Sequence, residues 1–156
     1  MKILAIGAHP DDIEIFMYGL LCIFKKKNYS INLIVSTDGS LGGTKFENLS
    51  KIRKKETIEA LKYLAVPDFL DLPDSKLGYS EFHKEILREK IDKISPDLII
   101  THYYKDYHSD HRVLSKLVTE ISGHRFPVLY CETMMGINFN PNCYFDISEF
   151  FLEKKK

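Results

Sequence analysis

Continuous apolar runs alternate with amphipathic segments along the chain, and this order restricts the fold more than any other feature. The runs are rich in Ile, Leu and Val, which is typical of strands buried on both faces of a sheet. Apolar residues three and four positions apart in the segments between them indicate helices. The predicted strands are residues 2–8, 31–36, 69–72, 98–102 and 128–133, and the predicted helices are residues 13–27, 49–64, 80–94 and 111–121.

This strand–helix order predicts an α/β fold, namely a Rossmann-like, doubly wound, mostly parallel sheet with helices on both faces. A chain of 156 residues is long enough to bury a core of its own, so we expect a single domain over residues 1–156. Ligands of such sheets bind at the carboxyl ends of the strands. We therefore expect the chemistry of this protein in the residues that directly follow predicted strands.

Two clusters of histidine and aspartate occupy such positions. His9, Asp11 and Asp12 follow the first predicted strand, and residues 106–112 (DYHSDHR) follow the strand at 98–102. Because both clusters fall on one edge of the sheet, they can converge on a single metal ion. Three protein ligands drawn from His and carboxylate suit catalytic zinc, which keeps a fourth position for water. The same donor set also suits iron(II), so both metals stay open.

Composition argues against several other kinds of protein. Lys and Arg together number 22, as do Asp and Glu, so a nucleic-acid-binding face is not expected. No apolar run approaches the length of a membrane span. Cys22, Cys131 and Cys143 are too scattered for a disulfide framework, and we interpret them as reduced thiols of a cytoplasmic protein.

A glycine-rich loop follows the second predicted strand, between Asp38 and Thr44. It would lie on the same sheet edge as His9. Glycines at such a place can bind phosphate, but this loop lacks the Lys-Ser/Thr of a P-loop and the spacing of a dinucleotide-binding motif. The sequence therefore assigns no ligand to these glycines.

The two metal-type motifs, residues 8–14 (AHPDDIE) and residues 108–111 (HSDH), resemble those of the PIG-L/LmbE-like N-acetylglucosaminyl deacetylase family. These proteins are zinc hydrolases that remove acetyl groups from amino sugars and related amides. The resemblance covers nearly the whole chain, because shorter matches occur in the family's order. They are residues 37–42, 52–56, 72–74 and 146–148.

The resemblance implies that His9, Asp12 and His111 are the zinc ligands. It implies that Asp11 is the general base, since neighbouring carboxylates on a tight turn point in different directions and one of them can reach the attacking water. Zinc lowers the pKa of that water toward ~7, and Asp11 would accept its proton.

Further roles follow from the same resemblance. His108, if protonated, would stabilise the oxyanion or protonate the leaving amine, and the carboxylate of Asp110 would orient His108. Arg53 and Asp74 would hold substrate hydroxyls, because one side chain donates hydrogen bonds and the other accepts them.

Each role has a simpler alternative. Asp12 could only cap the first helix, since Asp is a good N-cap. Arg53 could form a surface ion pair with Glu56 one helical turn away, and Asp74 could be a turn residue. The remaining histidines have no partner motif, so packing in the core or a place on the surface is the preferred interpretation for them: His83, His102 and His124.

The expected function is zinc-dependent hydrolysis of an N-acetyl group from an amino sugar of the N-acetylglucosamine type, or from its conjugate. One alternative is a related amidase that acts on another N-acyl or thiol-conjugate small molecule. Family members usually continue further after residues 146–148, so the resemblance implies a short carboxyl-terminal region. A second alternative is therefore a metal-binding module with little turnover. Exposed apolar residues near the end would favour a homo-oligomer, and they are Met134, Met135, Phe139 and Phe145.

Overall fold

A parallel sheet forms the centre of the computed structural model, which describes residues 1–43, 47–78, 80–134 and 136–154. Its five strands lie in the order β3-β2-β1-β4-β5, and all four pairings between neighbours are parallel. The predicted doubly wound parallel architecture is confirmed. The strands are β1 (Lys2–Gly7), β2 (Ser30–Thr37), β3 (Asp68–Leu72), β4 (Leu98–His102) and β5 (Val128–Cys131).

Helices connect the strands as predicted, and their ends lie at most three residues from the expected positions when the π-helical turn before the first helix is counted with it. The long helices are α1 (Tyr18–Lys26), α2 (Leu49–Leu61), α3 (Glu81–Ile94) and α4 (Ser109–Ser122). The first is preceded by a π-helical turn, η1 (Ile13–Met17), and such turns are frequent at functional sites. A 3-10 turn, η2 (Ser148–Phe150), and a short helix, α5 (Phe151–Lys154), were not predicted, because elements of three or four residues are too short to show a helical period. None of the helices in the described part of the chain is long and apolar enough to cross a membrane.

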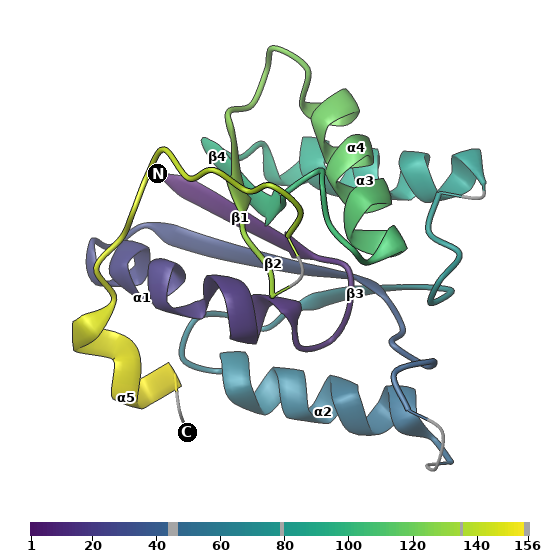
Figure 1. Ribbon diagram of the computed structural model, residues 1–156, viewed down its shortest axis with the longest axis horizontal. Helices are drawn as coiled ribbons and strands as arrows, with labels where there is room; N and C mark the ends of the chain where they lie inside the picture. The colour runs from purple at the N-terminus through teal and green to yellow at the C-terminus, as the bar shows by residue number, and fades with distance from the viewer. Residues whose placement is uncertain (44–46, 79, 135, 155–156) are drawn as a thin grey trace.

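Helices cover both faces of the sheet because successive side chains of β1 point to opposite sides. Ile3 and Ala5 pack in one core with residues of α1 and the end of α2. Leu4 and Ile6 pack in the other core with residues of α3 and α4. Figure 1 shows α1 and α2 on one side of the sheet and α3 and α4 on the other. The continuous apolar pattern of β1 is thus explained by burial on both faces.

The order of the strands decides where a ligand can bind. From β1 the chain proceeds through β2 to β3 on one side, whereas β4 and β5 lie on the other side of β1. The connections therefore diverge between β1 and β4, and ligands of open α/β sheets bind at this switch point, beyond the carboxyl ends of the strands. Both predicted clusters follow these two strands.

We predict that Leu4→Ala destabilises the protein by about 2–5 kcal/mol, because it removes buried methyl groups at the centre of the sheet. Leu4 is 0% exposed, whereas Val66 is 78% exposed and serves as the control site. Urea unfolding measures both variants, and Val66→Ala should change stability by no more than about 0.5 kcal/mol. Equal effects of the two substitutions would contradict the central burial of β1.

Candidate metal centre and active site

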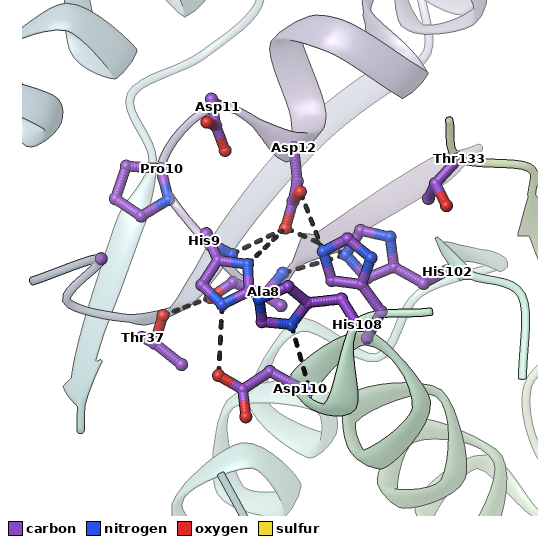
Figure 2. Close-up of polar contacts among 12 residues, drawn as sticks. Ala8, His9, Pro10, Asp11, Asp12, Thr37, His102, His108, Asp110 and Thr133 are labelled. Atoms are coloured by element: carbon purple, nitrogen blue, oxygen red, sulfur yellow. Dashed lines mark hydrogen bonds and ion pairs between the residues drawn. The ribbon is translucent and has the colours of Figure 1, made fainter. Parts of the chain in front are cut away.

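A cavity of about 360 Å³ opens at the carboxyl ends of β1 and β4. Seven of the eight predicted site residues line it, although they come from separate parts of the chain. They are His9, Asp11, Asp12, Arg53, Asp74, His108 and His111. The eighth, Asp110, lies behind His9, with its Oδ2 3.1 Å from His9 Nε2. The fold therefore brings together the residues that the sequence predicted as one site, and Figure 2 shows His9, Asp11, Asp12, His108 and Asp110 among them.

A tight turn places His9 and Asp12 at the end of β1. The backbone N–H of Asp12 donates to the carbonyl of His9 at 3.3 Å, and the backbone N–H of His9 donates to Asp12 Oδ2 at 2.7 Å. Asp12 stands at the N-cap position of η1 but makes no side-chain capping bond. The alternative that Asp12 only caps a helix is therefore wrong. Its carboxylate instead points into a group of histidines.

His9 and His111 share one arrangement, in which each ring lies between two carboxylates. The Nδ1 atom of His9 lies 3.4 Å from Asp12 Oδ2, and its Nε2 atom faces Asp110. The Nε2 atom of His111 lies 3.2 Å from Asp12 Oδ1, and its Nδ1 atom lies 3.0 Å from Asp106 Oδ2. Metal-binding histidines typically donate their second ring N–H to a carboxylate, which fixes the ring and its tautomer. This arrangement leaves one nitrogen of each ring for a metal.

Two of the distances among these atoms, which involve different oxygens of Asp12, are those expected between ligands of a tetrahedral metal site. Ligands at 2.0–2.1 Å from zinc in tetrahedral geometry lie about 3.3–3.4 Å from one another. The two contacts of Asp12 with His9 and His111, at 3.4 and 3.2 Å, are close to this value. Three overlapping groups have possible ligand atoms within 4.8 Å of one another: His9, His108 and His111; Asp12, His102 and His111; and His9, Asp74 and Asp110. The expected set of His9, Asp12 and His111 is not itself one of these groups: His111 belongs to the first two, His9 to the first and third, and Asp12 to the second.

The charges at the site also favour a cation. Burial by itself would lower the pKa of His9, but hydrogen bonds to Asp110 and Asp12 outweigh burial and raise it to about 10. Burial would raise the pKa of Asp12, but the charge of His102 and hydrogen bonds from the surrounding histidines hold it well below its usual range. The protein thus stabilises positive charge beside Asp12. A metal ion would supply that charge in place of a proton.

His102 is a site residue that the sequence left among the packing histidines. It is fully buried at the end of β4, and its Nε2 atom lies 3.1 Å from Asp12 Oδ2. The backbone N–H of Ala8 donates to the same nitrogen, and the ring stacks on that of His111 at 3.9 Å. Its position as the last residue of a strand beside β1 was the available signal. His83, by contrast, accepts a bond from the Gly78 amide and fits the packing interpretation.

Asp106 was likewise without a predicted role. Its Oδ2 atom contacts His111 Nδ1 and accepts a hydrogen bond from the Thr133 hydroxyl, while its Oδ1 atom accepts the backbone N–H of His108. Hydrogen bonds from these neighbours outweigh burial and lower the pKa of Asp106. Asp106 therefore remains an anion that fixes the orientation of His111.

Asp110 and His108 are arranged differently from the expectation that the Asp110 carboxylate orients His108. That carboxylate faces His9 and accepts the backbone N–H of Ser75 at 2.8 Å. Instead, the backbone N–H of Asp110 donates to Nδ1 of His108, at 3.2 Å. His108 thereby caps α4, which starts at Ser109, two residues earlier than predicted. Burial, together with the charges of His9 and His111, lowers the pKa of His108.

Asp11 and Arg53 form an ion pair at the rim of the cavity, with Arg53 Nη2 2.7 Å from Asp11 Oδ2. Among the ion pairs of the described residues, Arg53 is paired with Asp11 and not with Glu56. The alternative of a surface ion pair between Arg53 and Glu56 is therefore wrong. Burial and the charge of Asp12 raise the pKa of Asp11, against the lowering effect of Arg53 and His9. Asp74 lies in the cavity wall, where its carboxylate accepts the backbone N–H of Leu41 at 2.9 Å and stands 3.5 Å from His9 Nε2.

A doubly wound sheet with groups of His and Asp that could hold a metal ion at its switch point defines the chain as an α/β protein with a candidate metal site. Its sequence identifies the family more closely. Residues 4–122 match the family described as GlcNAc-PI de-N-acetylase (PIG-L), and the chain belongs to this family.

Known proteins of several activities are similar to this chain. Over 128 residues it is 33% identical to a probable N-acetyl-alpha-D-glucosaminyl L-malate deacetylase 2 of Bacillus subtilis (strain 168); the match covers 74% of this chain and 58% of the relative. The structure of an N,N'-diacetylchitobiose deacetylase from Pyrococcus horikoshii matches with a TM-score of 0.85 and 24% identity, covering 99% of this chain and 67% of that one. A 4-carboxy-2-hydroxymuconate hydratase from Pseudomonas putida KT2440 matches with a TM-score of 0.79 and 19% identity, covering 98% and 75%. These two structures confirm the fold alone, because one fold hosts different chemistries.

We predict that Asp106→Asn weakens the binding of zinc about 10–100-fold, because an amide in place of the carboxylate no longer fixes His111 as a ligand. Competition with a chromogenic chelator measures the affinity. Asp92→Asn is the matched control, since Asp92 pairs with Arg125 on the surface. Equal affinities of the two variants would show that Asp106 does not support a metal ligand.

Proposed function

We propose that this protein is a zinc-dependent hydrolase that removes an N-acetyl group from an amino sugar of the N-acetylglucosamine type, or from its conjugate. The observation that carries the proposal is the placement of His9 and His111, each between Asp12 and a second carboxylate, with Asp11 beside them at the same cavity. Membership in a de-N-acetylase family and the similarity to a deacetylase support the same reaction.

His9, Asp12 and His111 would hold the ion. When bound, zinc supplies a Lewis acid that lowers the pKa of a coordinated water and polarises the acetyl carbonyl. Iron(II) suits the same donors. Asp110 and Asp106 keep the second nitrogen of each imidazole occupied, so the rings cannot turn away from the ion.

Asp11 would move the proton. It is adjacent to Asp12 but lies outside the group of histidines, so its carboxylate is available to the attacking water (Figure 2). Asp11 accepts a proton from this water as the new C–O bond forms, and it returns the proton to the nitrogen as the C–N bond breaks. The products are acetate and a free amine, and Asp11 is restored.

His108 would stabilise the oxyanion as a neutral hydrogen-bond donor. Its Nδ1 atom accepts the backbone N–H of Asp110, so the proton of a neutral ring is on Nε2. From the wall of the cavity that N–H can donate to the oxygen on which negative charge develops. This role needs no protonated His108, in agreement with its lowered pKa.

The proposed substrate is a small N-acetylated sugar or conjugate, and the proposed location is the cytoplasm, where the thiols of Cys22, Cys131 and Cys143 would stay reduced. A homo-oligomer is also proposed. It is supported by the apolar side chains of Met134 and Phe145, which are 81% and 41% exposed. Met135, which was expected to contribute, lies outside the described residues.

We predict that Asp11→Asn lowers the rate of acetate release from N-acetylglucosaminides about 10²–10⁴-fold, because the amide accepts no proton. Zinc content should stay at the wild-type level, since the three proposed ligands are intact. Asp68→Asn is the control, because Asp68 pairs with Lys90 at the surface.

Unchanged hydrolysis by Asp11→Asn would refute the proposed base. A panel that also contains N-acyl amino acids and thiol conjugates distinguishes the other possibilities. Release of acid only from these compounds would indicate an amidase of different specificity. Retained zinc without turnover on any of them would indicate a metal-binding module.

A further inference from the structure

The guanidinium of Arg53 connects three segments around the base. Its Nη2 atom pairs with Asp11 Oδ2 at 2.7 Å and donates to the carbonyl of Pro10, and its Nη1 atom donates to the carbonyl of Gly39 at 3.0 Å. The side chain of Arg53 is only 15% exposed. Both terminal nitrogens are therefore engaged by oxygens of the protein before any substrate arrives.

Two glycines of the loop after β2 make room for this guanidinium. A Cβ atom at Gly42 would overlap Arg53 Nη1 and lie 3.1 Å from its Cζ. A Cβ atom at Gly39 would lie 2.8 Å from the same Nη1 and 2.7 Å from Cδ of Pro10, and the φ of +61° at Gly39 disfavours side chains as well. The glycines to which the sequence assigned no ligand thus form a cradle for Arg53.

The backbone conformation of Asp11 indicates why Arg53 is held in this position. Asp11 has a φ of +120°, a strained conformation for a residue with a side chain, which persists only where surrounding contacts hold it. Arg53 contacts both the carboxylate of Asp11 and the carbonyl of the residue before it. It is therefore placed to hold this strained residue in a single orientation.

We propose that Arg53 is a positioning residue for Asp11, and that Gly39 and Gly42 are required because they admit its guanidinium. The inference rests on the proposed function, in which Asp11 is the base. It differs from the substrate-binding role expected for Arg53, because a guanidinium that binds substrate hydroxyls acts on KM, whereas one that positions the base acts on kcat.

The test compares Gly42→Ala with Gly43→Ala. Among the described residues, a Cβ atom at Gly43 meets only Leu49 Cδ2, at 3.6 Å, an ordinary contact, so this variant is the matched control. Gly42→Ala displaces the guanidinium without removing its charge, and we expect about a 10²-fold fall in kcat with little change in KM, the effect of a misplacement of about 1 Å. Arg53→Lys keeps the positive charge but loses the two terminal nitrogens that contact separate partners, so it should behave in the same way. Zinc content and Tm should match those of the control.

A raised KM with unchanged kcat in Gly42→Ala and Arg53→Lys would overturn the inference and restore a substrate-binding role. If the wild-type protein releases no acetate from any N-acetyl sugar, the proposed function fails separately. Crystal structures of the two alanine variants then test the contact itself. Gly42→Ala should lose the pair between Arg53 and Asp11 and shift the Asp11 carboxylate, and an unmoved carboxylate would overturn the inference.

Discussion

The buried negative charge of Asp12 is the interaction on which the site depends. Asp12 is only 3% exposed, and a buried carboxylate is costly unless it is paired and hydrogen-bonded. Three imidazoles surround it, those of His9, His102 and His111, and two of these rings are held by further carboxylates behind them. This layered arrangement of opposite charges explains the displaced pKa values of His9 and Asp12, and it is what would let the site hold a cation.

The sheet makes this arrangement possible, because it brings residues distant in sequence to one edge. β1 carries the turn with His9 and Asp12, and its neighbour β4 leads to His102 and His111. The third contribution comes from the loop after β2, whose glycines accept the guanidinium of Arg53. The proposed metal ligands, the proposed base and the residue proposed to position it thus all come from segments at or beyond the carboxyl ends of three parallel strands, β1, β2 and β4, whose arrangement Figure 1 shows.

The fold could be predicted closely, because strands buried on both faces have an unmistakable apolar pattern and the helices between them are periodic. The sequence could predict that Asp12 and His111 belong to the site, because they lie in recognisable motifs. It could not predict which side chains contact each other within the site. His102 resembled the last residue of a core strand, and its contact with Asp12 depends on β1 and β4 being neighbours. The carboxylate of Asp110 faces His9 in a helix, α4, that begins at Ser109 with His108 as its N-cap, and sequence spacing does not encode the direction of a side chain.

The most direct test of this account is anomalous X-ray scattering at the zinc edge from crystals of the protein supplied with zinc. The account predicts one strong peak about 2.0–2.2 Å from a ring nitrogen of His9, a ring nitrogen of His111 and an oxygen of Asp12. A peak on other donors, or no peak at this edge of the sheet with zinc in excess, would contradict it.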